Sequence, residues 1–168
     1  MHMATTQSPF AEIFPRLYEL KAAVPDASHP DEYFQSFEER LEQSEHVRHQ
    51  YMKYERPLRV LDPEAWRDLK ERAAPLTMRR DPKRGWQMLF DTLNEGLGYA
   101  YLHSIGCTNI AFVQRDSKKT PDLRATYDER RVLCEVKTIN VSQDEADRRE
   151  RIQQGEIKAT KVDRKSVG

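Results

Sequence analysis

Residues 120–139 constrain the fold of this chain more than any other stretch, because two strand-like segments flank a polar pair, Asp128-Glu129. The strand-favouring residues of the second segment are Val132, Leu133, Cys134, Val136 and Ile139. A polar pair at the centre suits a tight turn that is open to water. The stretch therefore predicts two antiparallel strands that are joined at residues 128 and 129.

Three charged residues are expected to meet on one face of this hairpin. Side chains alternate between the two faces of a strand, so Glu135 and Lys137 share a face. A symmetric turn centred between Asp128 and Glu129 places Asp122 directly opposite Glu135, with Cβ atoms about 4.5–5.5 Å apart. Two ionised carboxylates at this separation repel each other, and such a pair beside a lysine indicates a bound cation. A slip of one residue would turn one carboxylate to the other face, so the interpretation depends on the register.

The segments Pro121-Asp122 and Glu135-Val136-Lys137 resemble the signature of the PD-(D/E)xK nuclease superfamily, whose members share the restriction-endonuclease-like fold. The resemblance covers residues 83–160, about half of the chain. It implies an α/β fold in which helices flank a mixed sheet core. We expect this core at residues 81–168, after a helical N-terminal region at residues 1–80. An ordinary hairpin with solvated charges is the alternative interpretation.

The resemblance also implies a site for Mg²⁺ or Mn²⁺ and the metal-dependent hydrolysis of phosphodiester bonds, with DNA as the favoured substrate. Asp122 and Glu135 would supply carboxylate oxygens, and the Val136 backbone carbonyl would add a further ligand. Lys137 would orient the attacking water or stabilise developing charge. In many members the helix before the first strand supplies another acid to the metal, and Glu95 matches that position. The catalytic residues that the resemblance implies are thus Asp122, Glu135, Lys137 and Glu95.

Apolar spacing and capping signals predict helices over residues 8–24, 31–55, 63–74 and 82–104. Pro15 is expected to divide the first of them into two pieces. Asp62-Pro63 and Asp81-Pro82 each combine a capping aspartate with a proline that suits the first helical position. Residues 58–61 are expected to be extended, and residues 107–114 to form a strand.

The helix over residues 82–104 is apolar on two sides, which indicates a helix packed between two layers. Glu95 belongs to the second apolar side, together with Met88 and Tyr99, whereas Tyr101 belongs to the first. A glutamate in such a place is costly unless it is paired or bound to a metal. Glycines 96 and 98 would allow close approach of the backbone.

The overall charge neither favours nor excludes a nucleic-acid partner, so local patches of charge matter more. Lys and Arg number 28, as do Asp and Glu, so the formal net charge is zero. The candidate phosphate contacts are Arg115, Lys118, Lys119 and Arg124, although a solvated loop explains the first three equally well.

Several features favour a cytoplasmic protein without a membrane partner. No apolar run is long enough to span a bilayer, and the N-terminus lacks the apolar region of a signal peptide. Cys107 and Cys134 lie in apolar surroundings and are expected to be free thiols. The resemblance also implies that a double-strand cutter of this kind would tend to form a homodimer, because one active site cuts one strand.

Two other functions stay open on the sequence alone. One is a nuclease-fold protein that has lost cleavage and acts in nucleic-acid binding or protein assembly. The other is a regulatory protein whose N-terminal helices form the working surface. The first is favoured by the C-terminal sequence, because residues 160–168 barely supply the strand that should follow a charged helix at residues 142–158. We therefore expect a core that is truncated or lacks its last strand.

Overall fold

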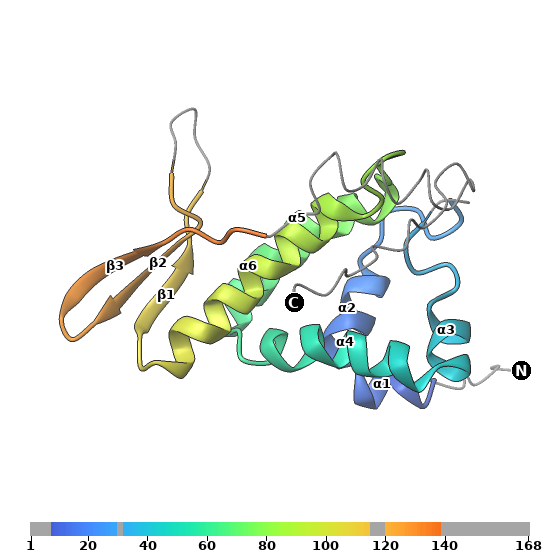
Figure 1. The fold of residues 1–168 in the computed structure, drawn as a ribbon, viewed down its shortest axis with the longest axis horizontal. Coiled ribbons are helices and arrows are strands. Elements are labelled where there is room, and N and C mark those ends of the chain that lie inside the picture. Colours follow the sequence, from blue (N-terminus) through green and yellow to red (C-terminus); the bar gives the residue numbers. More distant parts are fainter. Residues whose placement is uncertain (1–7, 30–31, 115–119, 139–168) are drawn as a thin grey trace, which may run out of the picture. The chain divides into compact units, whose positions relative to one another are not determined.

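A computed structural model of the 168-residue chain describes residues 8–29, 32–114 and 120–138. The chain divides into two units, residues 1–138 and residues 139–168, and every described residue belongs to the first. The described part is α/β, with six α-helices, one 3-10 helix and a three-stranded antiparallel sheet (Figure 1). The charged helix expected at residues 142–158 and the stretch at residues 160–168 both lie outside the described residues.

The elements follow one another in two runs, first helices and then strands. The helices are α1 (Phe10–Ile13), α2 (Pro15–Ala22), α3 (Phe37–Gln43), α4 (Glu45–Leu58), α5 (Pro63–Ala73), the 3-10 helix η1 (Ala74–Met78) and α6 (Gln87–Ser104). The strands are β1 (Thr108–Phe112), β2 (Leu123–Tyr127) and β3 (Arg130–Cys134), in the sheet order β1-β2-β3. The predicted break at Pro15, the helix after Asp62 and the first strand are confirmed. Within the described residues the sheet is antiparallel rather than mixed.

The single helix expected over residues 31–55 was wrong, because the structure divides it at Ser44. Ser44 has an extended backbone, and its hydroxyl accepts a hydrogen bond from the Val47 amide at 3.2 Å, which caps α4. The second helix then continues through Pro57 to Leu58, so the extended piece expected at residues 58–61 was also wrong.

The start expected for the last helix at Asp81-Pro82 was wrong too. The Asp81 carboxylate accepts hydrogen bonds from the amides of Lys83 and Arg84, as in a cap, but the chain then closes a turn. Asp81 and Gly85 exchange two backbone hydrogen bonds of 2.8 Å, and Gly85 has a φ of 60°. This backbone conformation favours glycine and interrupts the helical path, so α6 begins only at Gln87.

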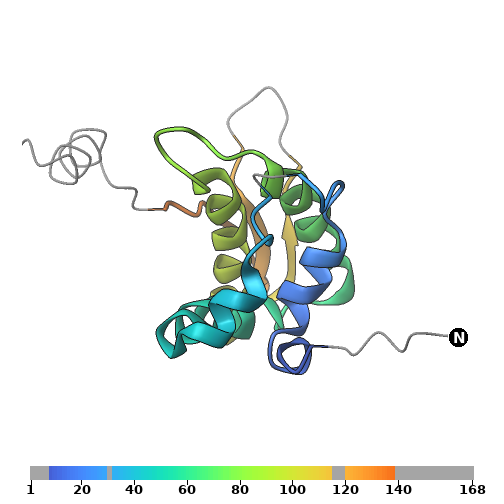
Figure 2. The same ribbon diagram turned by 90° about the vertical axis from the view of Figure 1, so that its right-hand side faces the viewer.

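Helix α6 is the central element of the described part, as the sequence predicts. It packs against α4 and α5 on one side and against β1 and β2 on the other (Figures 1 and 2). A Cβ atom at Gly96 would lie 2.7 Å from Leu58 Cδ2, and one at Gly98 would lie 2.6 Å from Val136 Cγ2. The two glycines therefore let α6 approach both layers closely.

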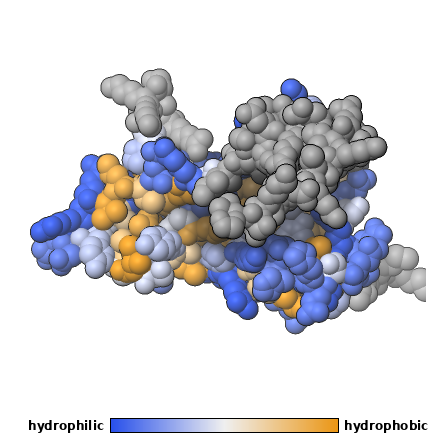
Figure 3. All heavy atoms as spheres, in the orientation of Figure 1, coloured by the Kyte–Doolittle hydropathy of each residue, from blue (hydrophilic) through white to orange (hydrophobic). Residues whose placement is uncertain are grey.

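Two members of the expected apolar sides of α6 were wrong, because Met88 is 53% exposed and Tyr101 is 63% exposed. Figure 3 shows apolar residues gathered over the sheet and the adjoining end of α6. Leu133 on β3 is one of the exposed apolar residues of the sheet, with 54% of its surface exposed.

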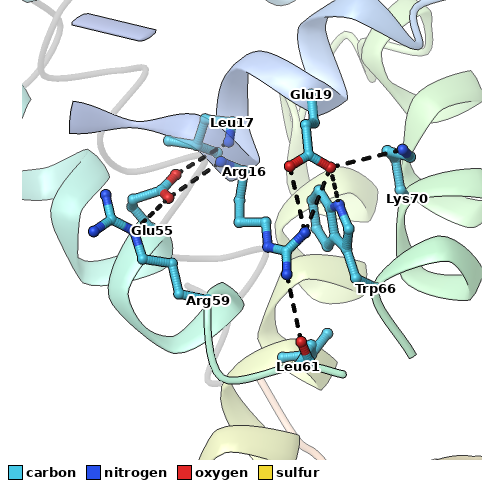
Figure 4. Close-up of polar contacts among 8 residues, drawn as sticks. All are labelled: Arg16, Leu17, Glu19, Glu55, Arg59, Leu61, Trp66 and Lys70. Atoms are coloured by element: carbon cyan, nitrogen blue, oxygen red, sulfur yellow. Dashed lines mark hydrogen bonds and ion pairs between the residues drawn. The ribbon is translucent and has the colours of Figure 1, made fainter. Parts of the chain in front are cut away.

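A buried carboxylate joins two of the N-terminal helices (Figure 4). Glu55 on α4 is fully buried, and its two oxygens accept hydrogen bonds of 3.1 Å from the amides of Arg16 and Leu17 at the start of α2. Glu19 on α2 accepts a hydrogen bond from the Trp66 indole on α5. These contacts fix α2 against α4 and α5. None of the described helices has the length and apolar character that crossing a membrane requires.

The hairpin has the register that the sequence predicts. Leu123 faces Cys134 and Tyr127 faces Arg130, so the turn falls at Asp128 and Glu129. These two residues have φ values of 47° and 61°, as in the type I′ turns that match the twist of antiparallel strands. Cys107 and Cys134 are both free thiols, as expected.

Candidate active site

Asp122 is held at the start of the middle strand by its backbone and its side chain. Its amide donates to the Cys134 carbonyl at 3.0 Å, and its carbonyl accepts from the Val113 amide at 3.0 Å. The Asp122 Oδ2 atom accepts a hydrogen bond from the Val136 amide at 2.8 Å. Contacts with the chain on both sides of the strand therefore fix where this carboxylate lies.

Counted from the turn at residues 128 and 129, the last regular pair of the hairpin is Leu123 with Cys134, so the regular pairing does not reach Asp122. Leu123 already faces Cys134, and the Asp122 amide bonds to the same Cys134 carbonyl, so the ladder slips by one residue, as in a β-bulge. Pro121 has no N–H group and cannot extend the ladder. A continued ladder would direct the Val136 amide to the Pro121 carbonyl, and the Asp122 carboxylate takes that place. Asp122 therefore does not pair directly with Glu135, contrary to the prediction. Its carboxylate contacts the amide of the next residue, Val136, instead.

Glu135 and Lys137 share the exposed face beyond the end of β3, as the alternation predicts. Their side chains are 47% and 75% exposed, and Lys137 Nζ lies 3.7 Å from Glu135 Oε1. Val136, between them, turns inward against Gly98 of α6. The Asn94 amide of α6 donates to the Thr138 hydroxyl at 2.9 Å, which holds the segment after Lys137.

Glu95 is buried, as its place on α6 predicts, and its described partner is an arginine. Only 4% of Glu95 is exposed, and Arg72 Nη1 of α5 lies 2.6 Å from its Oε2 atom. Arg72 also binds Asp68 through Nε at 2.7 Å, and its guanidinium lies 4.8 Å from the centre of the Phe112 ring. Burial alone would lower the pKa of Arg72, but its ion pairs with Asp68 and Glu95 outweigh burial and raise that pKa.

Arg72 was missed by the sequence analysis. Its spacing of four residues from Asp68 shows only an ordinary pair on one helix, and nothing local indicates a partner on α6. Its buried Nη2 atom makes no hydrogen bond with the part of the chain that the structure describes. A buried donor of this kind is costly unless it binds a partner, so Arg72 belongs among the residues considered for the site.

The structure brings some of the expected residues together and separates others. Asp122 lies next to the Glu135-Val136-Lys137 segment, whereas the Arg72 pair of Glu95 lies between α5 and α6. Among the described residues, no group of three or more His, Cys, Asp and Glu side chains is placed to hold a metal ion. Arg124 is exposed on β2, while the expected phosphate contacts of the loop at residues 115–119 lie outside the described ranges.

The pKa of the Cys134 thiol, beside the candidate site, is raised. Burial, and after it the Asp122 carboxylate, raises the pKa of Cys134. A raised pKa keeps this thiol protonated near neutral pH, which makes it a poor nucleophile and a poor metal ligand. The oxygen atoms at this end of the hairpin are therefore the groups suited to bind a cation.

Comparison of the chain with protein-family models, with curated proteins and with solved structures found no match.

Proposed function

We propose that this chain is a divalent-metal-dependent nuclease that hydrolyses phosphodiester bonds in DNA, with Asp122, Glu135 and Lys137 at its centre. The observation that carries the proposal is the contact between the Asp122 carboxylate and the Val136 amide. It fixes one carboxylate beside the residue that separates Glu135 from Lys137. The sequence resemblance to the PD-(D/E)xK superfamily points to the same three residues.

The residues present are of the kind that Mg²⁺ or Mn²⁺ prefers. Carboxylate oxygens of Asp122 and Glu135 and the carbonyl of Val136 are hard ligands, which suit these cations. A metal bound there would polarise a phosphoryl oxygen and lower the pKa of a bound water. The Val136 amide would keep the Asp122 carboxylate in one orientation. Lys137, a cation beside Glu135, would stabilise the charge that develops on the phosphate.

Glu95 receives a less direct role in this proposal. The Oε2 atom of Glu95 forms an ion pair with Arg72, which offsets part of the negative charge of Glu95. We therefore assign Glu95 an indirect role, a contact with the metal through water, and we assign Arg72 the role of holding Glu95 in place.

The test is cleavage of circular and linear DNA with Mg²⁺ or Mn²⁺ by the wild type and by the double variant Asp122→Asn/Glu135→Gln. The matched control is Asp128→Asn/Glu129→Gln, which makes the same chemical changes at the far end of the hairpin. We expect the wild type and the control to cut, and the site variant to lose at least a hundredfold in rate. Equal rates in the two variants would refute the site.

The second candidate is a nuclease-fold protein that binds nucleic acid or assembles with other proteins without cutting. One observation favours it: in the described ranges, Glu95 is engaged by Arg72, and no three-residue metal group is formed. DNA binding without metal-dependent cleavage by the wild type would support this candidate over the first.

A further inference from the structure

We infer that the turn at residues 79–85, which precedes α6, binds the phosphate backbone of a nucleic acid. We call it the basic turn, and its residues are Arg79, Arg80, Asp81, Pro82, Lys83, Arg84 and Gly85. The inference rests on the proposed function, because the substrate it identifies would be the one cut at Asp122 and Glu135.

The basic turn carries four cations and one acid in six residues, from Arg79 to Arg84. All four cationic residues are exposed, and none of them forms an ion pair with another described residue. Other cations, such as Arg59 and Arg72, are bound to carboxylates that hold the fold together. None of these four cations is therefore committed to an ion pair that holds the described part together.

The acid of the turn is used to order the backbone. Asp81 Oδ1 accepts hydrogen bonds from the Lys83 amide at 2.8 Å and the Arg84 amide at 2.6 Å. These two amides, that of Arg84 first, lower the pKa of Asp81. Two backbone bonds between Asp81 and Gly85 close the turn. The cations thus project from a fixed backbone, which lowers the entropy lost when they bind a ligand.

The position of the basic turn suits a strand of nucleic acid that passes the candidate site. Val136 packs at Gly98 and Thr138 binds Asn94, so the chain beyond β3 runs along α6 toward the end where the turn lies. From residue 98 to the helix start at residue 87, α6 rises by about 16 Å. This length equals roughly five nucleotides of one B-form strand. A duplex that is cut at Asp122 would therefore extend to the basic turn within about five base pairs, half of one turn of the double helix.

The test measures DNA binding with the metal left out, so that cleavage does not interfere. A short fluorescent duplex is titrated with the full chain, and the affinity is followed between about 50 and 200 mM salt. The test variant replaces Arg79, Arg80, Lys83 and Arg84 with Gln. The control variant replaces four other exposed cations, Lys53, Arg56, Arg67 and Arg130, with Gln, and circular dichroism checks that both variants fold.

We expect the test variant to bind at least tenfold more weakly than the control variant. The slope of log K against log salt should fall by about one for each phosphate contact that is lost. Equal affinities of the two variants would overturn the inference and leave the nuclease proposal standing. Binding that depends on the turn, without any cleavage when metal is added, would support the inference and count against the nuclease.

Two further outcomes would also overturn the inference. One is no duplex binding by the wild type at the lowest salt. The other is competition by poly-glutamate that equals competition by DNA at the same total charge, since this would identify an acidic polypeptide as the partner. If the fourfold variant does not fold, the double variant Arg79→Gln/Lys83→Gln is tested against Lys53→Gln/Arg67→Gln.

Discussion

At the scale of single residues, the partner of each carboxylate decides what that carboxylate can do. Asp122 and Glu95 are both expected metal ligands, yet Asp122 is held by a backbone amide and Glu95 by a guanidinium. An amide orients a carboxylate, whereas a guanidinium also offsets part of its charge. The Val136 amide places the Asp122 carboxylate beside Glu135, as a direct metal ligand requires.

The Arg72–Glu95 pair should stabilise the fold. Replacing Arg72 with Met would leave Glu95 buried without its described ion-pair partner, and we expect the free energy of unfolding to fall by about 2 kcal/mol. The effect is smaller than for a fully buried pair because the Arg72 side chain is 36% exposed.

Urea unfolding of the wild type, Arg72→Met and Asp68→Asn checks this expectation. Asp68 also binds Arg72 but is 42% exposed, so its variant should change stability by less than about 0.5 kcal/mol. Similar losses in the two variants would contradict the account.

The turn of the hairpin offers a prediction in the stabilising direction. Glu129 has a φ of 61°, a left-handed conformation that costs residues with a Cβ about 1–2 kcal/mol. Glu129→Gly should therefore raise the free energy of unfolding by about 0.5–1 kcal/mol, after the entropy cost of glycine in the unfolded chain is subtracted. Thermal unfolding measures the gain, and Glu129→Ala, which keeps the Cβ, should show none of it.

At the scale of elements, the same local signal gave two results. Asp62-Pro63 begins α5 as predicted, because Ala65, Trp66 and Leu69 follow and bury one face of a helix. Asp81-Pro82 is followed by Lys83 and Arg84, which have no apolar face to bury, and Gly85 then closes a turn. A capping signal therefore predicts a helix only where burial supports the turns that follow it.

The cap of α5 should make stability depend on pH. Hydrogen bonds to Asp62, the largest effect coming from the Ala65 amide, lower its pKa below the ordinary 3.8. A lowered pKa adds stability above the ordinary value and loses it as the pH falls through the folded-state value. Asp62→Asn keeps a capping acceptor but does not titrate, so its difference from the wild type should shrink between about pH 7 and pH 2.

Unfolding of Asp62→Asn and Asp62→Ala by urea at both pH values tests the cap. The alanine variant should lose about 1 kcal/mol near neutral pH because the cap is removed. A difference between Asp62→Asn and wild type that stays constant with pH would show that the charge of Asp62 adds nothing.

Substitutions at Gly96 and Gly98 of α6 should distinguish effects on stability from effects on metal binding. A Cβ at Gly96 would press on Leu58 and Leu69 of the helical layer, whereas a Cβ at Gly98 would press on Val136 and Leu123 of the hairpin. We expect either alanine variant to lose about 1–3 kcal/mol of stability. Only Gly98→Ala should also weaken metal binding, because Val136 holds the Asp122 carboxylate. Equal metal affinities in the two variants, measured by calorimetry, would contradict this.

At the scale of the whole molecule, local rules predicted the hairpin and the central helix, and long-range contacts limited the rest. Alternation and the polar pair at residues 128 and 129 were enough for the register of β2 and β3. The bonds from Glu55 to Arg16 and Leu17 span almost 40 residues, and no pattern in the sequence indicates them. The slip at Asp122 was likewise missed, although Pro121, which cannot donate to a ladder, was the signal that could have indicated it.

The central claim is that the end of the hairpin binds a divalent cation, and calorimetric titration of Mn²⁺ tests it most directly. The proteins are the wild type, Asp122→Asn/Glu135→Gln, and the control Asp128→Asn/Glu129→Gln at the other end of the same strands. We predict that the wild type and the control bind Mn²⁺ with the same affinity, and that the site variant binds at least tenfold more weakly. Absence of binding by the wild type, or equal binding by the two variants, would contradict the claim.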